Sequence, residues 1–570
     1  MSWNLKEKAD RLLGEEQGTV RKDWGGRVAF ALVYPNTYAV GMSNLGFQTI
    51  YHHLNALPDV VCERVVLPDP EDLPEYRRTA TQPFSLESKR PLADFDFVGF
   101  SITYEGDYIN TLRLLRMAGI PLDPAARRPE DPVILMGGVC AFANPEPIAP
   151  FMDFIVVGEG EEIVRDIVDA YRGAFGPKDW TGRRRADLWD RLQSIPGIYL
   201  PHRYTVDYHP DGTVAGVVPG GGAPARITKR RLGNVDDFQT LSLLRTPNAE
   251  YGHLALLEVG KGCGRGCRFC LEGEIYRPVR HRSLDSLRQS VRELAKHGKR
   301  VGLVGACVSD YPWIGGLLRI IEEEGLELSI SSLRADSLTE DLVASLQRGG
   351  HRTLTIAPEA GTERLRRVIR KNISDEQLYA ACDLVRAYGI PNLKCYFMIG
   401  QPTETGEDVD AIPDLATRLL ERLRVPSREG HPFGRLTLSV SSFVPKPWTP
   451  FQWASFDHVA SLESKLRTIK AGVRRFPNVR VLHENPREAF LQALIARGDR
   501  RVAPFLARAA ELEGDWRTAL REWDGDAEFY TYRPRPLGET FPWDHLEVGV
   551  KKAGLIREYE RAGLAAAVVS

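Results

Sequence analysis

Three cysteines in the middle of the chain are the residues whose type and spacing best suit chemistry. Cys263, Cys267 and Cys270 stand in the run Glu-Val-Gly-Lys-Gly-Cys-Gly-Arg-Gly-Cys-Arg-Phe-Cys. A structural zinc site closes with four protein ligands, so these thiolates would need a further ligand, for which His253 or His281 is nearest in sequence. A four-iron cluster held by only three cysteines instead keeps one iron free to bind a small molecule. The spacing therefore predicts either a zinc site or a reactive iron-sulfur cluster.

The residues around the cysteines suit a loop that wraps a cluster. A strand-like run, Leu254 to Val259, leads into the loop. Arg265 and Arg268 would place positive charge beside an anionic cluster. Three glycines allow the positive φ angles and close backbone approach that wrapping needs, namely Gly262, Gly264 and Gly266. The local sequence therefore favours the cluster over zinc.

The cysteine spacing, C-x-x-x-C-x-x-C behind a strand, resembles the signature of the radical S-adenosylmethionine (radical SAM) superfamily. The resemblance implies a 4Fe-4S cluster on Cys263, Cys267 and Cys270, with S-adenosylmethionine as the second cofactor. It also implies that a one-electron donor such as flavodoxin or ferredoxin drives cleavage of S-adenosylmethionine to methionine and a 5'-deoxyadenosyl radical. Phe269 stands where the superfamily usually has an aromatic residue near the adenine.

Strand-like and helix-like segments alternate after the cysteine loop. Helical spacing of apolar residues between Leu284 and His297, for example, is followed by a strand-like run from Val301 to Val304. Including the run before the loop, six strands are predicted between Leu254 and Phe443. The alternation predicts an α/β barrel with parallel strands, and six strands are too few to close a full one. We expect a partial (β/α)6 barrel over residues 246–450, with its chemistry at the carboxyl ends of the strands.

Polar segments after the barrel strands resemble the superfamily's contacts to S-adenosylmethionine. After the second strand, Ser309 or Asp310 stands where an acid usually meets the amino group, although the segment departs from the common Gly-Gly-Glu form. A plain turn is the alternative at that point. Arg334, at the end of the third strand, is a candidate for binding the carboxylate of S-adenosylmethionine, with a structural salt bridge as the alternative.

Two later segments resemble the methylthiotransferase and Elongator-like branches of the superfamily. After the fourth strand, Ala-Pro-Glu-Ala-Gly is similar to their Gly-x-Glu-Ser-Gly pattern, so that Glu359 would accept hydrogen bonds from the ribose hydroxyls or else be a structural acid. After the fifth strand, Gly-Gln-Pro-Thr-Glu-Thr resembles their Gly-x-Pro-Thr-Glu-Thr loop. There Met398 and Ile399 would flank the adenine, or simply be strand core, while Gly400 shapes the turn.

The first part of the chain, residues 1–175, reads as a Rossmann-like domain. Strand and helix patterns alternate, and glycine-rich turns such as Gly137 to Cys140 and Gly158 to Glu162 follow predicted strands. This arrangement resembles the cobalamin-binding domain that precedes the barrel in many radical SAM enzymes. The Asp-x-His-x-x-Gly loop that supplies a cobalt ligand does not occur here. Cobalamin is therefore a candidate cofactor without that ligand, and a scaffold or substrate clamp is the alternative.

Two further regions complete the predicted organisation. Residues 176–245 read as a bridging insert with a hairpin that turns at Pro210 to Gly212, and residues 451–570 as a mostly helical C-terminal extension. The whole arrangement resembles an uncharacterised radical SAM branch with a cobalamin-domain-like N-terminus. In the extension, a group of basic and aromatic residues could hold an anionic or nucleic-acid substrate, or could be a solvated helix face beside an aromatic core: Arg497, Arg500, Arg501, Trp543 and His545.

Composition sets few limits on function. The chain has 570 residues, 43% of them hydrophobic, and 75 basic against 76 acidic residues, so no overall charge indicates nucleic acid or membrane as a partner. No stretch approaches the length of a membrane-spanning helix. Eight cysteines, scattered apart from the triplet, suggest a reducing compartment. These features predict a cytoplasmic protein that contacts no membrane.

The sequence thus predicts a radical SAM enzyme whose substrate is unidentified, with methyl transfer or RNA modification as candidate reactions. Methylthiolation is disfavoured, because the enzymes that perform it carry a second three-cysteine cluster in the N-terminal domain, where this chain has only Cys62 and Cys140. The alternative function is a cluster-containing RNA-binding or sensor protein without turnover.

Overall fold

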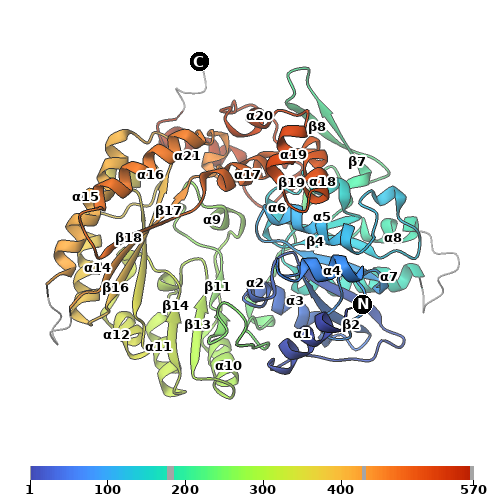
Figure 1. Ribbon diagram of the computed structural model, residues 1–570, viewed down its shortest axis with the longest axis horizontal. Helices are drawn as coiled ribbons and strands as arrows, with labels where there is room; N and C mark the ends of the chain where they lie inside the picture. The colour runs from blue at the N-terminus through green and yellow to red at the C-terminus, as the bar shows by residue number, and fades with distance from the viewer. Residues whose placement is uncertain (1, 176–184, 426–431, 565–570) are drawn as a thin grey trace.

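Two α/β lobes lie side by side, and the C-terminal helices cross above both (Figure 1). The computed structural model describes residues 2–175, 185–425 and 432–564. The start of the predicted bridging insert, 176–184, and the end of the predicted C-terminal extension, 565–570, lie outside the described residues. Within the described ranges, no helix is long and apolar enough to cross a lipid bilayer.

The N-terminal lobe contains a six-stranded sheet, counted over the described residues, in the order β2-β1-β3-β4-β5-β6. The first five strands run parallel, and β6 is antiparallel to β5. The strand order reverses at β1, which is where doubly wound sheets bind ligands at their carboxyl edge. The strands are β1 (Val28–Tyr34), β2 (Val60–Val66), β3 (Phe97–Ser101), β4 (Val133–Gly137), β5 (Phe154–Val156) and β6 (Ile198–Tyr199).

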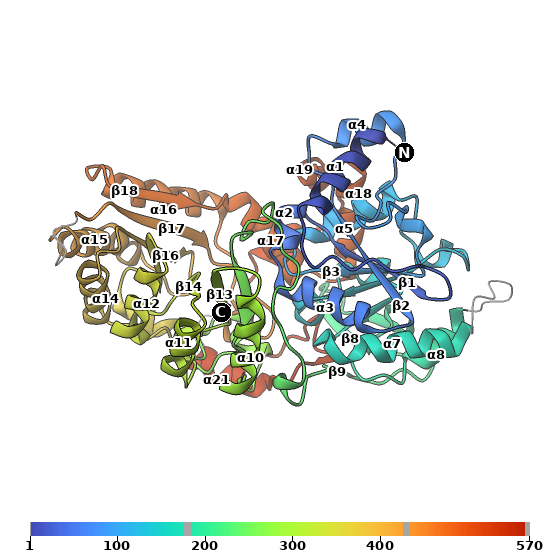
Figure 2. The same ribbon diagram turned by 90° about the horizontal axis from the view of Figure 1, so that it is seen from below.

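Helices cover both faces of this sheet, so every residue of β1 is buried. One set of alternate β1 residues packs with α3 and α7, and the other set packs with α5 (Figure 2). The helices of this lobe are α1 (Trp3–Gly14), α2 (Tyr38–Met42), α3 (Leu45–Ala56), α4 (Leu73–Thr79), α5 (Asp107–Met117), α6 (Val139–Ala143), α7 (Gly160–Phe175) and α8 (Arg185–Leu192). The Rossmann-like architecture predicted for this region is confirmed.

The second lobe is a partial barrel of parallel strands in two sections, β10-β13-β14 and β15-β16-β17-β18. A single parallel bridge between Leu333 and Ile356 joins the sections. All six predicted strands are present, and β18, from the region expected to be mostly helical, pairs with β17 as a further strand. The strands are β10 (Ala255–Glu258), β13 (Arg300–Val304), β14 (Glu327–Ile330), β15 (Thr353–Glu359), β16 (Asn392–Ile399), β17 (Arg435–Ser442) and β18 (Val479–His483).

Burial alternates strictly along the middle strands of the barrel. In β16, Leu393, Cys395 and Phe397 are buried and pack with the surrounding helices, whereas Lys394 and Tyr396 between them are only half-buried. Because successive strand residues point to opposite faces, the half-buried set faces the barrel interior. The helices of this lobe are α9 (Leu271–Ile275), α10 (Leu284–Ala295), α11 (Ile314–Glu323), α12 (Glu340–Arg348), α13 (Glu363–Val368), α14 (Asp375–Ala387), α15 (Gly406–Leu423) and α16 (Val459–Val473).

Short strands and C-terminal helices connect the lobes. The predicted hairpin is present as β7 (Tyr204–Tyr208) and β8 (Val214–Pro219), and β9 (Ile227–Thr228) pairs with β19 (Leu546–Glu547) from the end of the chain. The remaining helices are α17 (Pro486–Arg497), α18 (Ala503–Glu511), α19 (Trp516–Glu522), α20 (Ala527–Thr531) and α21 (Lys552–Arg561).

The basic and aromatic residues of the C-terminal region do not form a substrate surface. Arg497 is 1% exposed and donates to backbone carbonyls such as that of Tyr530 at 2.6 Å. Trp543 and His545 are buried as well. The guanidinium of Arg500 donates to the carboxylate of Glu146, a residue of the N-terminal lobe, at 2.8 Å. Burial of Arg497, Trp543 and His545 leaves them no surface for an anionic substrate, and it equally excludes a solvated helix face at these residues. Arg500 instead joins the C-terminal region to the N-terminal lobe.

Candidate functional site

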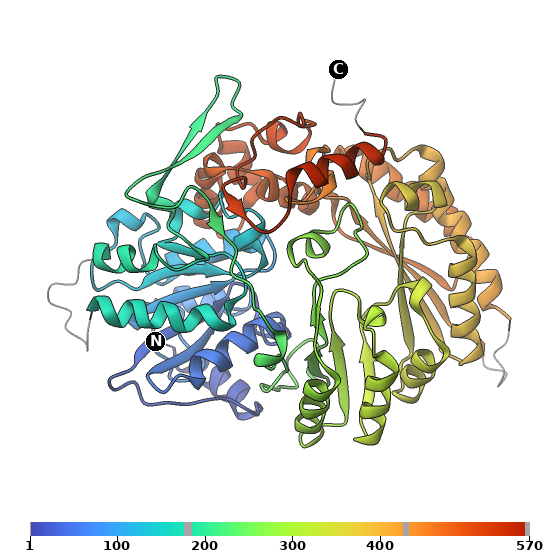
Figure 3. The same ribbon diagram turned by 180° about the vertical axis from the view of Figure 1, so that it is seen from behind.

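The three cysteines lie on a loop between β10 and α9. The short strands β11 (Gly260–Lys261) and β12 (Arg280–His281) pair with each other and close this loop at its base. Gly262 and Gly266 have φ angles of 85° and 71°, and a Cβ on Gly262 would lie 2.5 Å from the backbone oxygen of Tyr276. Only glycine fits where the loop folds back on itself. Figure 3 shows the loop and α9, in light green, between the lobes and below the C-terminal helices.

The three thiols are half-exposed and accept few hydrogen bonds. Sγ of Cys263 accepts from the backbone N–H of Arg265 at 3.5 Å. Sγ of Cys270 caps α9 by accepting from the backbone N–H of Gly273 at 3.4 Å. Few protein hydrogen bonds therefore hold the cysteine sulfurs, as suits the ligands of an inorganic group.

Burial favours the protonated form of two of the three thiols, those of Cys267 and Cys270. It raises the pKa of Cys270 to about 12 and raises the pKa of Cys267 in spite of the positive charge of Lys371. Iron would displace these protons, because a metal binds the thiolate. No group of three His, Cys, Asp or Glu side chains within the described ranges converges on a single metal ion. A 4Fe-4S cluster makes a different demand, since each cysteine binds its own iron, and the loop fits that demand.

Arginine and aspartate side chains connect the cysteine loop to the carboxyl ends of the barrel strands. Arg265 donates to both carboxylate oxygens of Asp310, at 2.6 and 2.5 Å, and to Asp336 at 3.1 Å. Arg334 also donates to both oxygens of Asp336, at 2.9 and 3.0 Å, and its Nη1 lies 4.0 Å from Sγ of Cys267. Two of the predicted contact residues, Asp310 and Arg334, therefore belong to one ion-pair network beside the cysteines.

A second connection runs from Arg334 to Glu359. Nη2 of Arg334 donates to the backbone oxygen of Lys371 at 2.9 Å. The Nζ atom of Lys371 lies 3.1 Å from Oε1 of Glu359. These contacts place the predicted ribose contact, Glu359, on the same side of the barrel as Cys267.

The backbone at Glu359 is held in an unusual conformation. Its backbone φ angle is +70°, a value that residues other than glycine rarely adopt. The pairing of β15 with β16 shifts register just before this residue. Nε2 of Gln401 donates to the backbone oxygens of both Glu359 and Met398, each at 2.9 Å. The Gln401 amide therefore holds the ends of these two strands in a fixed relation, and strained positions of this kind cluster at functional sites.

The predicted adenine contacts Met398 and Ile399 lie on opposite faces of β16, and Gly400 follows them in the turn. Met398 is half-buried on the interior face, while Ile399 is 0% exposed and packs with the surrounding helices. The side chain of Ile399 therefore cannot reach a ligand inside the barrel. Gly400 has a φ angle of 79°, and a Cβ there would lie 2.8 Å from Leu462. The turn thus requires glycine for reasons of packing.

The last two predicted contact residues have protein partners. The hydroxyl of Ser309 lies 2.7 Å from the hydroxyl of Ser337. Phe269 packs against the core cluster between the lobes. Both lie next to the cysteine loop, and neither points to a ligand by its contacts alone.

Sequence analysis missed three residues of this site, namely Asp336, Lys371 and Gln401. Asp336 and Lys371 belong to no recognised motif. Lys371 lies in a turn between Arg370 and Asn372, both of which have positive φ angles. The Gln401 position falls inside the Gly-x-Pro-Thr-Glu-Thr pattern, at its variable residue, and could have been noted as a polar side chain beside the strand end.

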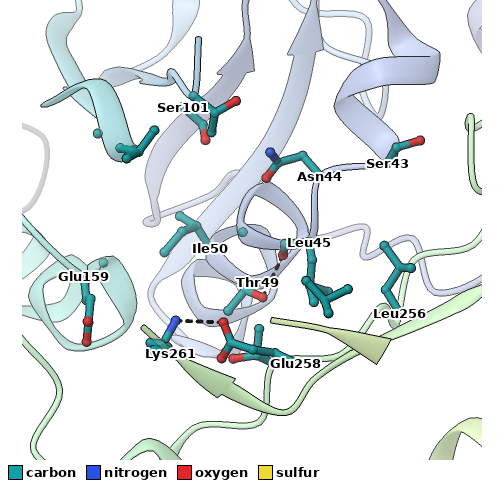
Figure 4. A pocket seen from close by; sticks show the side chains of 18 of the residues that line it. Ser43, Asn44, Leu45, Thr49, Ile50, Ser101, Glu159, Leu256, Glu258 and Lys261 are labelled. Atoms are coloured by element: carbon teal, nitrogen blue, oxygen red, sulfur yellow. Dashed lines mark hydrogen bonds and ion pairs between the residues drawn. The ribbon is translucent and has the colours of Figure 1, made fainter. Parts of the chain in front are cut away.

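A cavity of about 1000 Å³ lies between the lobes. This volume is at the upper end of the ~300–1,000 Å³ typical of ligand pockets. Figure 4 shows Asn44, Thr49 and Ile50 of the N-terminal lobe facing Leu256 and Glu258 of the barrel across it. Six glycines from the strands, helix starts and loops of the N-terminal lobe line this wall: Gly46, Gly99, Gly137, Gly138, Gly158 and Gly160. A Cβ on Gly137 would meet no atom nearer than Val156 at 4.0 Å, so the wall is open to a ligand at this residue.

One buried lysine joins the two lobes at the edge of the cavity. Nζ of Lys261 lies 3.1 Å from Glu161 of the N-terminal lobe and 3.1 Å from Glu258 of the barrel. Burial would lower the pKa of Lys261, but the two carboxylates outweigh it and raise that pKa. Glu159 and Arg280 form a further pair between the lobes. These pairs fix the cavity walls close to the cysteine loop.

The loop after β1 has a tyrosine at the place of the cobalt-ligating histidine. It reads Asn-Thr-Tyr-Ala-Val-Gly from Asn36 to Gly41, with Tyr38 where the Asp-x-His-x-x-Gly pattern has histidine. The Tyr38 hydroxyl donates to Glu16 at 2.6 Å and is buried away from the cavity.

Comparisons with known proteins agree with this geometry. A family model described as "Radical SAM proteins, N-terminal" matches residues 46–201, and one described as "Radical SAM superfamily" matches residues 257–416. The second match includes the cysteine loop, the Arg334 network and Glu359.

Among curated relatives, an uncharacterised protein of Methanocaldococcus jannaschii is 30% identical over 480 residues, covering 84% of this chain and 90% of that protein. A tRNA-2-methylthio-N(6)-dimethylallyladenosine synthase of Methylacidiphilum infernorum is 26% identical over 27% of this chain and 37% of its own length. A ribosomal protein uS12 methylthiotransferase of Thermotoga petrophila is 23% identical over 28% of this chain and 40% of its own length. The match to these two enzymes is thus confined to less than half of each.

Among solved structures, the cobalamin-dependent S-adenosylmethionine radical enzyme OxsB with aqua-cobalamin bound has a TM-score of 0.45 at 15% identity, covering 70% of this chain and 52% of that one. Its complex with S-adenosylmethionine also has a TM-score of 0.45, at 14% identity, covering 95% and 79%. That likeness is too low to assign a ligand to this chain. The two family models and the long match to the archaeal relative are sufficient for classification. The chain belongs to the radical SAM superfamily, whose cofactors are a 4Fe-4S cluster and S-adenosylmethionine.

Proposed function

We propose that this chain is an enzyme that binds the 4Fe-4S cluster through Cys263, Cys267 and Cys270 and cleaves S-adenosylmethionine to start a reaction on a second substrate. The observation that carries the proposal is the run of contacts from Cys267 through Arg334 and Lys371 to Glu359. It joins a cysteine motif for the cluster to an acid suited to bind ribose hydroxyls, at the carboxyl ends of parallel barrel strands, where such enzymes work.

The chain's own residues would bind and orient, while the cluster and S-adenosylmethionine supply the one-electron chemistry. Arg334 and Lys371 place positive charge beside Cys267, which offsets the negative charge of iron-bound thiolates. Glu359 is fixed by Lys371 and by the Gln401 amide, so its carboxylate is oriented before a ligand arrives. Met398 offers an apolar side chain for a flat base on the interior face of β16.

Anaerobic reconstitution with iron and sulfide tests this proposal. Reduced protein mixed with S-adenosylmethionine should release 5'-deoxyadenosine, measured by chromatography. Protein that carries a full cluster but releases none with dithionite would contradict the proposal and favour the alternative of a cluster-containing sensor or RNA-binding protein.

We also propose that the cavity between the lobes holds a corrinoid, which would make methyl transfer the reaction class. Support comes from the size of the cavity, its place at the carboxyl edge of a doubly wound sheet, and its glycine wall. Ser101, Gly137 and Gly138 would contact the ligand, and the buried Tyr38 would leave cobalt without a ligand from the β1 loop. Methylthiolation has less support, because Cys62 and Cys140 are buried and separate from each other in the N-terminal lobe.

A variant whose side chain partly fills the cavity tests the corrinoid proposal. Gly137→Leu would project side-chain atoms into the cavity, so it should abolish corrinoid absorption in protein that has been supplied with cobalamin and passed through a desalting column. Gly216→Leu is the matched control, because Gly216 lies on the hairpin with no atom near its Cβ position. Wild-type protein that retains no corrinoid would contradict the proposal.

A further inference from the structure

A row of polar side chains crosses the interior face of three neighbouring barrel strands. On β16, Lys394 is in register with Thr355 of β15 and with Thr437 of β17. Two residues further along β16, Tyr396 is in register with Ser439 of β17. All five side chains are half-buried on the face opposite the surrounding helices. We refer to these five residues as the Lys394 row.

The polar atoms of the Lys394 row have no partners in the part of the chain that the structure describes. The ammonium of Lys394 forms no ion pair there and lies 4.8 Å from the centre of the Tyr396 ring. None of the four hydroxyl side chains is hydrogen-bonded within the described ranges. Fully buried polar groups pair with protein or ordered water, whereas these half-buried groups stay open to water or to a species that enters the barrel interior. Closed barrels fill such inward positions with branched apolar residues, so this interior is arranged for something polar.

The Lys394 row lies below the proposed S-adenosylmethionine site and beside the cavity. Met398 is two residues beyond Tyr396 on the same face, which is roughly 7 Å along a strand. On β15, Thr353 lines the cavity between the lobes and precedes Thr355 by two residues on the same face. Ser329 on the neighbouring strand lines the cavity as well. The interior of the barrel therefore continues from the cavity to the row.

The charge of this interior favours an anion. Glu359, the carboxylate at the end of β15 on the same face, is already paired with Lys371. Lys394 is thus a cation without a protein counter-charge in the described structure, surrounded by hydroxyl groups that donate hydrogen bonds. A lysine ammonium binds phosphate or carboxylate oxygen as a compact point charge.

We propose that the Lys394 row binds an oxyanion group, phosphate or carboxylate, of the substrate on which the radical chemistry acts. Lys394 supplies the charge, and Thr355, Thr437, Ser439 and Tyr396 supply hydrogen bonds. The substrate is then a small polar molecule that places its reacting carbon above the row. This inference rests on the proposed function, because it takes the carboxyl ends of β15 and β16 to be the S-adenosylmethionine site.

Calorimetry on the anaerobically reconstituted protein, saturated with S-adenosylmethionine, tests the inference with two probes. Inorganic pyrophosphate represents phosphate and citrate represents carboxylate. One of them should bind with a stoichiometry near one per chain, and Lys394→Met should weaken that binding at least about tenfold, the cost of a charge-assisted hydrogen bond. Lys394→Arg should retain most of the affinity. The probe that binds identifies the source of the oxyanion.

Matched variants separate the possible failures. Lys299→Met is the control, because Lys299 is exposed and outside the barrel interior. Ser439→Ala is a second, smaller change that should weaken binding without removing charge. The inference is overturned if neither probe binds to wild-type protein, or if Lys394→Met binds them as wild type does. Release of 5'-deoxyadenosine by the same wild-type sample reports separately on the proposed function, so the two can fail independently.

Discussion

The ammonium of Lys371 lies 3.1 Å from Oε1 of Glu359, and the two side chains are 8% and 13% exposed. Neither residue is near the cysteine loop in sequence, yet the backbone oxygen of Lys371 accepts a hydrogen bond from Arg334 beside Cys267. Breaking a buried pair by removing one partner is strongly destabilising, because the other charge is left without compensation. The pair therefore links the stability of the barrel edge to the binding of ligands there.

Glu359→Ala should weaken the binding of S-adenosylmethionine roughly tenfold to a hundredfold while leaving the cluster intact. The reason is the loss of a charge-assisted hydrogen bond, worth on the order of 1.5 to 3 kcal/mol. Anaerobic titration followed through the electron paramagnetic resonance signal of the cluster measures the affinity. Glu376→Ala, at an exposed position on α14, is the control. Unchanged affinity would mean that Glu359 is only a structural acid.

Lys371→Met should lower the melting temperature by leaving Glu359 buried without its partner. The expected loss is on the order of 3 kcal/mol, as for other broken buried pairs. The double variant Lys371→Met/Glu359→Gln removes the uncompensated charge and should regain much of that loss. Differential scanning fluorimetry of Lys371→Met, Glu359→Gln and the double variant measures how far the two stability losses depend on each other. Additive losses would show that the two side chains do not interact.

Replacing Cys263, Cys267 and Cys270 together by alanine should remove nearly all iron and sulfide from the reconstituted protein. The three thiols are the ligands that the loop offers, and their half-exposed sulfurs have few protein partners. Chemical analysis of iron and sulfide measures the loss. Cys307→Ala is the control, since Cys307 is a half-buried neighbour outside the motif. A triple variant that keeps its iron would disprove the assignment.

Asp107→Asn should stabilise the protein at neutral pH but not at acid pH. Burial raises the pKa of Asp107 from 3.8 to about 6, against the hydrogen bonds that Asn110 and Asn36 donate to it. Because the folded chain holds this proton more tightly than the unfolded chain, stability falls as the pH rises from 3.8 to about 6 and stays lower above that range. The loss of folding stability that this pKa shift causes is about 3 kcal/mol at most.

Melting temperatures of wild type and Asp107→Asn, taken near the two ends of this pH range and at neutral pH, test the prediction. The difference between them should be small at the acid end and largest at neutral pH. Asp410→Asn, at an exposed position on α15, should show no such trend. A gain of equal size at every pH would mean that burial does not shift the titration of Asp107.

Periodic patterns in the sequence were sufficient to predict six strands of the barrel. The six barrel strands between Leu254 and Phe443 were predicted from alternating segments, and the structure contains all of them. The strand β18 was missed because Val479 to His483 is short and lies between two helical segments. The alternation of buried and half-buried residues along β16 places Met398 on the interior face and Ile399 in the core.

Residues that act through distant contacts could not be predicted in this way. Arg497 and His545 were candidates for substrate binding because of their type, and the structure buries both. Lys371 was not singled out, since no local spacing marks it, and Gln401 was given no role although it stands inside a recognised loop. Their roles depend on turns that bring α13, β15 and the β16 loop together.

The sequence by itself determined the cysteine loop, the family and the two α/β lobes, because these depend on short spacings and on the period of apolar residues. Only the tertiary structure decided which charges are paired. It joined Lys371 to Glu359, Lys261 to acids of both lobes, and left the Lys394 row without protein partners in the described residues. The physical reason is that a local pattern fixes the direction of a side chain relative to its own strand or helix, whereas its partner depends on how the whole chain packs.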